Sequence, residues 1–403
     1  MAVRIASTLS EHPLATHAVG ECAGALLEAG GHSPDLVLLS VTPPLTGALE
    51  DILGATRALL APGVQVAVTT DRILTARREV TLTTALSMCA LWVTDELSLP
   101  TLQTPAEESE PRVKAIRLSG CIDWEKPDDS ELEQLRAATG TLILFGDPSL
   151  RSAAQILRSI SEVAPGLRVI GGTTGSSRNP GTARLFLDGQ MHTDGLIAAL
   201  ISPQVPTQAT VTQGCTAFGA PMLATRAERN VIYELDGRSA LEVVQELLAT
   251  VSLDSRPAAR DSLRIGVAQT SEPDHNPIHY FGVLGADKAA KSIMVEDEVG
   301  LGTTVQFALR DARSATEDLV AVLSTLPQAQ ACLAFTSSSR NLAYFGGPHH
   351  EASVISEALH AAAVWGISCC DVFGSNTAAV QVLDHAASLL TFPVSGRADF
   401  GSI

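Results

Sequence analysis

The chain alternates short, fully apolar runs with amphipathic segments, and this alternation occurs three times. Each time an apolar run is followed by a polar loop, a helical pattern and a second apolar run. The three pairs of apolar runs are residues 35–41 and 64–70, 141–146 and 167–172, and 331–337 and 364–370. Two apolar strands joined through a helix in so few residues predict parallel pairing with a right-handed crossover. Another strand-like run follows each unit, so the repetition reflects either internal duplication or ordinary α/β alternation.

The run from Val211 to Val244 lies near the middle of the chain and joins two halves of similar length. Its first strand-like stretch breaks at Gly214, and a second strand is predicted over 230–235. A turn follows, and Ser239 begins an amphipathic helix. We therefore expect a junction between two halves here, with 1–222 as an N-terminal domain and 223–403 as a C-terminal domain.

The C-terminal half also contains short strand patterns separated by Gly, Asp and Pro turns, which predict an antiparallel meander. These patterns are residues 263–269, 279–287, 292–295 and 303–311, with a loop expected at 257–261. The predicted fold class is therefore α/β to α+β. It consists of two fused halves of layered mixed β-sheets covered by helices, with strand–helix–strand units and a C-terminal-half antiparallel meander.

Composition agrees with this architecture. The chain has 403 residues, 45% of them apolar and only 4% aromatic, which suits closely packed α/β layers and more than one core. The net charge of −17 disfavours binding to nucleic acid or to an anionic membrane surface. No run approaches the roughly 20 apolar residues that span a bilayer. The N-terminus lacks a secretory signal, and the seven cysteines lack paired spacing. We therefore expect the protein to reside in the reducing environment of the cytoplasm.

The sequence lacks the motifs of several common kinds of active site and ligand site. The phosphate-binding GxxxxGK[ST] loop, the GxGxxG fingerprint, the HExxH helix and the GxSxG elbow are all absent. The histidines have no metal-ligand spacing, since His349 and His350 are adjacent and point apart. We therefore expect no bound metal and no cofactor.

A turn rich in glycine and threonine ends the strand expected at 167–172. It reads Gly171, Gly172, Thr173 and Thr174. Paired glycines let backbone amides approach a ligand closely, and the two hydroxyls can bond an acidic or amide group. Ligands of open α/β sheets gather beyond the carboxyl ends of strands, so these residues are a ligand-binding candidate. A simple tight turn explains the spacing equally well.

Gly214 and Cys215 form a second candidate, where a strand meets a loop. A nucleophilic cysteine needs a base and a lowered pKa. The closest charges in the sequence are Arg226 and Arg229, and neither is a base. A small buried hydrophobe beside a backbone kink is therefore the favoured interpretation of this cysteine.

Polar residues also follow the two strands of the third unit. Ser337, Ser339, Arg340 and Asn341 combine hydroxyls, a guanidinium and an amide, which could clamp a small molecule carrying a carboxylate. A polar loop with a surface arginine is the alternative. Asp371 stands at the equivalent place on the next strand and is either an acidic ligand contact or a turn former.

The order and spacing of these motifs resemble the FIST domain proteins, a family named for F-box and intracellular signal transduction. The resemblance extends from about Asp35 to Phe392. It rests on VIGGTTGS (169–176), LFLDGQMHTDGLIAALIS (185–202), VTQGCTAFG (211–219), NVIYELDGRSALEVV (230–244) and the later AVWGI and AASLLTF stretches. The GCxxxG motif followed by the ELDGxxA block is the most specific part.

The resemblance implies N- and C-terminal FIST halves that bind a small ligand, with amino acids the usual proposal, and pass a signal to an output module. Since the module fills the chain, the output partner would be a separate protein. Two loops depart from the family. The 336–340 loop keeps the arginine of a Cys-x-x-Arg pattern without its cysteine, and Asp371 replaces a glutamate and is displaced by one position.

Three hypotheses follow in order. The first is a cytoplasmic, non-enzymatic sensor that binds an amino acid or related small carboxylate. The second is a scaffold whose pocket has degenerated. The third is a hydrolase or transferase that uses Cys215 or a serine of the 337–339 loop.

Overall fold

The computed structural model describes residues 2–94, 111–118, 132–150, 153–175, 183–193, 195–251, 256–267, 279–374 and 380–394. The chain divides into two compact units. The first comprises residues 1–211 and 322–403, and the second comprises residues 212–321. The polypeptide thus leaves the first unit once and returns to it, whereas the division expected from the sequence has a single boundary between residues 222 and 223.

The first unit contains three successive segments. The first segment is β1 (Ala2–Ser10), α1 (Ala15–Gly30), β2 (Leu36–Val41), η1 (Pro43–Ala48), α2 (Leu49–Leu60), β3 (Val64–Thr69), β4 (Arg72–Thr75), β5 (Arg78–Thr81) and β6 (Leu86–Thr94). The second is β7 (Val113–Leu118), β8 (Gly140–Gly146), α4 (Ala153–Val163), β9 (Leu167–Thr174), β10 (Leu185–Leu187), β11 (Gln190–His192) and β12 (Leu196–Ile201). The third is β13 (Gln208–Thr212), β22 (Ala329–Ser337), α8 (Leu342–Phe345), α9 (His350–Leu359), β23 (Ala363–Gly374), β24 (Gln381–Leu383) and β25 (Ala387–Pro393). Helix α7 (Ala312–Ser324) precedes β22 in the chain, and most of it falls in the second unit.

These three segments share one strand order, namely β1-β6-β2-β3, β7-β12-β8-β9 and β13-β25-β22-β23. In each segment the two strands that flank the crossover helix are parallel. The last strand is antiparallel to the first strand of that pair. The three predicted strand–helix–strand units are therefore confirmed, and their repetition extends to the topology of the whole segment.

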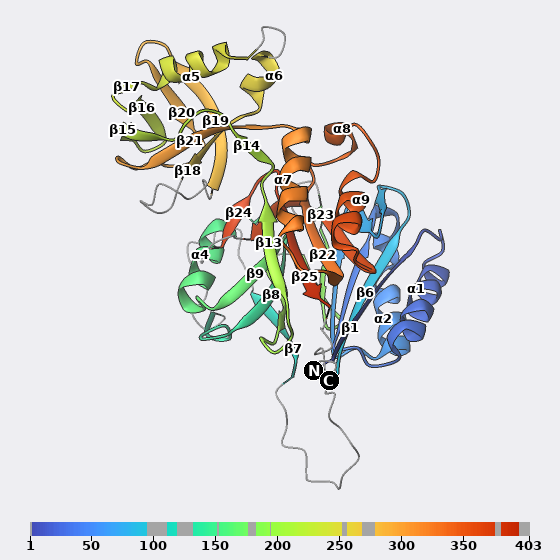
Figure 1. Ribbon diagram of the computed structural model, residues 1–403. Helices are drawn as coiled ribbons and strands as arrows, with labels where there is room; N and C mark the ends of the chain where they lie inside the picture. Colours follow the sequence, from blue (N-terminus) through green and yellow to red (C-terminus); the bar gives the residue numbers. More distant parts are fainter. Residues whose placement is uncertain are drawn as a thin grey trace, which may run out of the picture. The chain divides into compact units, whose positions relative to one another are not determined.

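The strands of the first unit build one six-stranded and one eleven-stranded sheet, which pack face to face. Their shared core contains side chains of both sheets, among them Leu38, Leu91, Phe145, Phe335 and Trp365. Helices α1 and α2 cover the outer face of the six-stranded sheet, and α4 covers part of the outer face of the other (Figure 1). This confirms layered mixed sheets covered by helices.

Helix α2 shows how the sequence specifies a layer. Its buried residues are Leu49, Ile52, Leu53, Thr56 and Leu60, which recur every three or four positions and so occupy one face. Glu50 and Asp51 in the first turn and Arg57 in the last turn carry charges that suit the helix dipole. The helix ends at Ala61, which adopts a left-handed conformation with φ of 48°.

The second unit is an antiparallel β structure with helix α5 (Ala240–Ala249). Its strands are β14 (Cys215–Ala217), β15 (Met222–Glu228), β16 (Val231–Leu235), β17 (Arg238–Ser239), β18 (Leu263–Val267), β19 (His279–Asp287), β20 (Ser292–Val295) and β21 (Thr304–Arg310). Because β21 pairs with both β15 and β18, the order β21-β15-β16-β20-β19-β18 closes on itself. Three strands of the predicted meander, β18, β19 and β20, pair in chain order, whereas the fourth, β21, pairs with β18 and β15 instead of β20. Closure into a barrel removes most of the open edges.

Three local predictions in the second unit have clear outcomes. The turn between β16 and β17 is confirmed, since Asp236 and Gly237 have φ of 49° and 75°, which favours asparagine, aspartate and glycine. Ser239 caps α5, because its side chain accepts a hydrogen bond from Glu242 N. The loop expected at 257–261 is wrong, since helix α6 (Arg256–Asp261) forms there.

Within the described ranges, no helix is long and apolar enough to cross a bilayer.

Candidate functional site

Gly171 and Gly172 lie inside β9, so this strand continues two residues beyond its predicted end at residue 172. A Cβ atom built on Gly171, whose φ is 139°, would lie 1.8 Å from Leu144 O on the neighbouring strand. One built on Gly172 would lie 2.4 Å from Asp371 O. The glycines therefore let β8 and β23 approach β9, and this packing explains their presence.

Thr173 and Asp371 join β9 to β23 at a β-bulge. Between the Cys369–Thr174 pair and the Val372–Gly172 pair, β23 contains one residue more than β9. Asp371 N donates to Thr173 Oγ1 over 2.9 Å, and Thr173 Oγ1 lies 3.2 Å from Asp371 Oδ2. The predicted acidic residue thus holds the two strands together, with only 9% of its surface exposed.

Ser337, Cys369 and Thr174 form a row across three neighbouring strands, because Cys369 is the register partner of both others. The Ser337 and Ser339 hydroxyls are 2.8 Å apart. Thr174 Oγ1 is buried and has no hydrogen-bond partner among the described residues. Burial raises the pKa of the Cys369 thiol well above its ordinary value, so this cysteine is an uncharged part of the core.

Arg340 belongs to a buried group of four charges, the charge quartet, formed with Glu351, Arg72 and Glu79. Arg340 Nε lies 2.7 Å from Glu351 Oε1, and Arg72 lies 3.3 Å from Glu351 and 3.0 Å from Glu79. All four side chains are at most 9% exposed. The two positive and two negative charges compensate one another, and buried charges are tolerated only when they are paired in this way.

Arg72, Glu79 and Glu351 were not predicted as site residues from the sequence. Arg72 also donates to Thr336 Oγ1 over 2.7 Å, and Glu79 Oε1 accepts from the first backbone amides of α9. The one available signal was Glu351, a charged residue on the apolar face of a helical pattern. Its partners are up to 279 residues away, so no local pattern could have identified them.

One of the three guanidinium nitrogens of Arg340 has no hydrogen-bond acceptor among the described residues. Nε bonds Glu351, and Nη1 donates to His385 O over 3.2 Å. Nη2 is buried without a hydrogen-bond partner in the described part of the chain. The ring of Phe345 lies over the guanidinium, with its centroid 5.5 Å from the Arg340 carbon Cζ.

Asn341 is occupied by the local fold. Its Oδ1 accepts from Ala343 N and Tyr344 N and so caps α8, and its Nδ2 donates to Ser338 O. The turn before it is closed by a hydrogen bond from Arg340 N to Ser337 O. Asn341 therefore positions the short helix that carries Phe345.

Gly214 and Cys215 belong to the second unit. Gly214 N donates to Asp318 Oδ2 over 2.8 Å, and Arg310 Nε donates to Cys215 Sγ over 3.4 Å. Burial raises the pKa of the Cys215 thiol, and the Arg310 charge opposes this only in part. Within the described ranges, the thiol itself donates to Gln213 O over 3.5 Å. A protonated thiol without a hydrogen-bonded base is a poor nucleophile.

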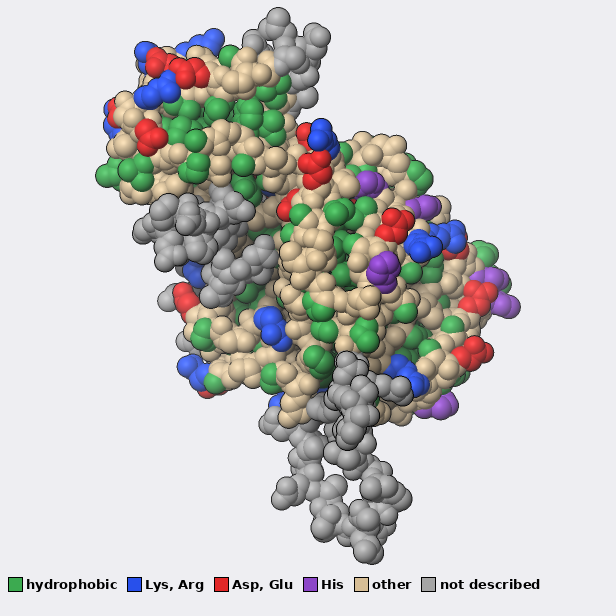
Figure 2. Space-filling view, in the orientation of Figure 1, with side chains coloured by type: hydrophobic (Ala, Val, Ile, Leu, Met, Phe, Trp, Pro, Cys, Tyr) green, Lys and Arg blue, Asp and Glu red, His purple; other side chains and the backbone are tan. Residues whose placement is uncertain are grey.

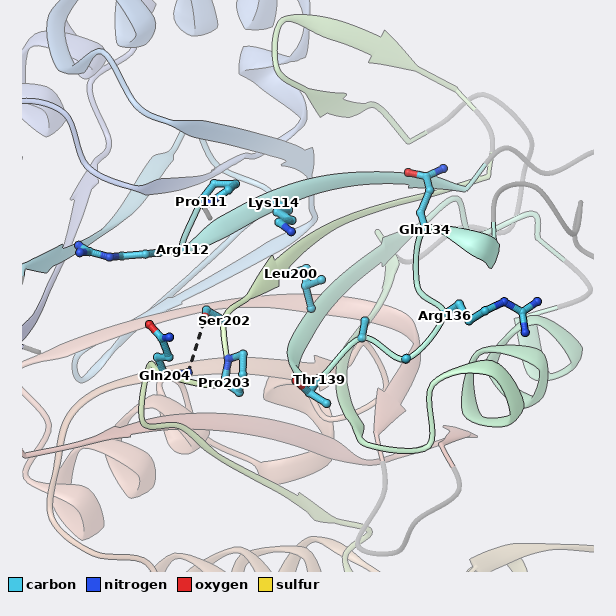
Figure 3. A pocket seen from close by; sticks show the side chains of 12 residues that line it. Pro111, Arg112, Lys114, Gln134, Arg136, Thr139, Leu200, Ser202, Pro203 and Gln204 are labelled. Atoms are coloured by element: carbon cyan, nitrogen blue, oxygen red, sulfur yellow. Dashed lines mark hydrogen bonds between the residues drawn. The ribbon is translucent and has the colours of Figure 1, made fainter. Parts of the chain in front are cut away.

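A surface cavity of about 660 Å³ lies elsewhere in the first unit, at the end of β7 and β12 (Figure 3). It contains none of the predicted site residues. Arg112, Lys114 and Arg136 supply positive charge, although Arg136 is paired with Glu133. On the face shown in Figure 2, basic and acidic side chains of the described residues are interspersed rather than gathered by sign.

Comparison with known proteins places this geometry in a family context. The FIST N domain matches residues 35–238, and the FIST C domain matches residues 240–370. An uncharacterized protein of Mycobacterium bovis is 29% identical over 366 residues, which cover 89% of this chain and 90% of the relative. An uncharacterized protein of Mycobacterium tuberculosis is 27% identical over 380 residues, covering 89% and 91%.

Proposed function

The chain belongs to the FIST family, and from this premise we propose that it is a cytoplasmic sensor of a small molecule. FIST domains are associated with sensing in signal transduction. The proposed ligand is an amino acid or a related small carboxylate, bound near Arg340 in the first unit. The proposed output partner is a separate protein.

The observation that carries the proposal is the unpartnered Nη2 of Arg340. A buried donor without an acceptor destabilises a protein by about 1–3 kcal/mol. Arg340 is 0% exposed, so water at the surface cannot satisfy this nitrogen. A carboxylate or carbonyl oxygen of a ligand would supply the missing acceptor, and the Ser337 and Ser339 hydroxyls at the same turn would add further hydrogen bonds.

Access to Arg340 requires a local movement, and this links binding to signalling. Phe345 of α8 covers the guanidinium, and its ring also stacks on His350 with centroids 4.3 Å apart. Helix α8 is a single turn, Leu342–Phe345, with no buried residue. A ligand that binds only when α8 is displaced shifts the population toward the displaced state. The displaced segment is the surface that an output partner would recognise.

A thermal-shift screen with the standard amino acids and small mono- and dicarboxylates tests the proposal. A ligand present at about 100 times its Kd stabilises the protein by ~2.7 kcal/mol. Arg340→Lys should abolish the shift, because lysine keeps the charge beside Glu351 but lacks the forked nitrogens. Arg72→Lys alters the same charge quartet away from Nη2 and should retain the shift. A screen in which no compound stabilises the wild-type protein counts against the proposal.

The pairing of Arg340 with Glu351 favours a second candidate, the scaffold with a degenerate pocket. In that case the arginine has become a structural residue, and ligand would stabilise neither the wild-type protein nor any variant. Hydrogen exchange of residues 342–346 distinguishes the two candidates. The sensor predicts faster exchange in this segment when a hit from the screen is bound, and the scaffold predicts no change.

A further inference from the structure

The surface cavity of about 660 Å³ beside β7 and β12 has the size of a small-molecule site, since such sites measure about 300–1,000 Å³. Lys114 and Leu200, which are register partners on these two strands, belong to its lining. The other lining residues come from the segments before β7 and before β8 and from the turn after β12, and they are residues 111–112, 134, 136–139 and 202–204. None of the residues proposed to bind a ligand around Arg340 lines this cavity.

The backbone around the cavity is fixed by a hydrogen bond and by one glycine. Ser202 N donates to Arg112 O over 2.9 Å, which joins the residues before β7 to those after β12. A Cβ atom built on Gly140, whose φ is 111°, would lie 2.2 Å from Ile201 O. This glycine therefore lets the start of β8 approach the end of β12. Because the cavity is formed without a ligand, binding requires little reordering of the chain.

The charged residues of the lining all have the same sign. They are Arg112, Lys114 and Arg136, and among the described residues no acidic side chain lines the cavity. The chain as a whole has the opposite balance, with 44 acidic against 27 basic residues. Gln134 and Gln204 add exposed amide groups, which can donate hydrogen bonds to an anion. The lining therefore favours an anionic ligand over a cationic one.

Arg112 and Arg136 are held by different contacts. Arg112 donates from Nη1 to Val93 O, so this hydrogen bond orients the guanidinium and its acceptor is uncharged. Arg136 pairs with Glu133 over 2.6 Å, but the two side chains are 62% and 59% exposed. An exposed ion pair of this kind contributes little to stability, so the Arg136 guanidinium can turn to a ligand at small cost.

The cations are spread along the cavity rather than gathered at one point. Figure 3 shows Arg112 and Arg136 on opposite sides of the lining, with Lys114 and Leu200 between them. A molecule with an anionic group at each end can approach both arginines, which one compact anion reaches less well. Leu200 and Pro203 add apolar surface to the lining, which suits an apolar spacer between two anionic groups.

We propose that this cavity binds a small organic molecule that carries two anionic groups, carboxylate or phosphate, on a short apolar spacer. One anionic group lies against Arg112 and the other against Arg136, and Lys114 attracts both. Guanidinium groups form paired hydrogen bonds with carboxylates and phosphates alike, so the two kinds of anion share one chemistry here. This site is separate from Arg340 and does not depend on the proposed sensor function.

Calorimetric titration of the full chain at low ionic strength tests the inference. The probes are adipate and the bisphosphate ester of hexanediol, and the comparison compounds of the same chain length are hexanoate, hexanediol and hexanediamine. The dianions should bind most tightly, hexanoate more weakly, and the neutral and cationic compounds not at all. The tighter dianion identifies carboxylate or phosphate as the recognised group. Added salt should weaken its binding, because salt screens exposed charges.

Two pairs of matched variants locate the binding, and all four substituted side chains are exposed, so the variants should fold. Arg136→Met and Gln204→Glu each make the lining more negative and should weaken the tighter dianion by about fivefold. Arg313→Met is the control for the first, since Arg313 forms an exposed 2.7 Å pair with Glu317 outside the cavity. Gln190→Glu on β11 is the control for the second. Both controls should bind as the wild type does.

Four results would overturn the inference. The first is wild-type protein that binds neither dianion at concentrations on the order of 10 mM. The second is hexanediol or hexanediamine binding as tightly as the dianions. The third is unchanged binding in both lining variants, because the dianion would then bind elsewhere. The fourth is loss of dianion binding in Arg340→Lys, which would move the site to Arg340, whereas this inference expects that variant to bind like the wild type.

Discussion

The Nε atom of Arg340 lies 2.7 Å from Glu351 Oε1, and neither side chain has any exposed surface. This ion pair joins the turn after β22 to the first turn of α9. Through Glu351 it also reaches Arg72 of β4, so the third segment is tied to the first. The residue that the sequence offers as a ligand clamp is therefore also a structural residue, and its variants must be chosen accordingly.

Glu351→Gln should destabilise the protein by about 3–5 kcal/mol, because buried Arg340 would lose its carboxylate partner and Arg72 would keep only that of Glu79. Urea unfolding followed by circular dichroism measures this change. Glu317→Gln is the control, since it breaks an exposed 2.7 Å pair with Arg313 and should leave the unfolding midpoint unchanged. Equal midpoints for both variants would show that the charge quartet contributes nothing.

Gly172→Ala should destabilise the protein by about 1–3 kcal/mol or more, since the added methyl meets backbone that cannot move freely. The oxygen in its way, Asp371 O, would be 2.4 Å from the new Cβ. Gly24→Ala in α1 has open surroundings and should instead stabilise by about 0.5–1 kcal/mol. Thermal unfolding of both variants checks the prediction, and a neutral Gly172→Ala would refute the packing explanation of the glycine pair.

Cys215 should react slowly with iodoacetamide at neutral pH. Its thiol pKa is raised by burial, so the reactive thiolate is scarce until the pH exceeds the ordinary value for cysteine. Because the Arg310 charge lowers this pKa, Arg310→Met should raise it further and slow alkylation more. Mass spectrometry of the 211–226 peptide over a pH series measures both rates. Fast alkylation at neutral pH would restore the enzyme hypothesis.

Tyr280 should make the protein sensitive to alkali. Burial raises its pKa from 10.0 to about 12. The unfolded chain therefore loses this proton at lower pH than the folded chain does. The stability associated with Tyr280 is complete below pH 10 and is lost as the pH rises toward about 12. Tyr280→Phe should flatten the fall in urea midpoint across this window, and an equally steep fall in the variant would contradict the assignment.

The sequence predicted those parts of the fold that depend on residues near one another in the chain. The apolar pattern of 35–70 predicts β2, α2 and β3 because helix and strand periodicities are local properties. The Asp236-Gly237 turn and the Ser239 cap follow for the same reason. The loop prediction for residues 257–261 was wrong because proline was taken as a loop signal. Proline is, however, tolerated in the first turn of a helix, and Pro257 is the second residue of α6.

The sequence indicates where the candidate residues stand along the chain, but it does not indicate what their side chains contact. Strand ends mark where Thr173, Ser337, Arg340 and Asp371 stand, and the FIST resemblance rests on the order of motifs along the chain. Tertiary structure alone decided which atoms these side chains meet. Arg340 pairs with Glu351, which also pairs with Arg72. A Cβ atom at Gly172 would lie too close to Asp371 O. Such contacts depend on how distant strands pair, and this pairing is a property of the whole fold.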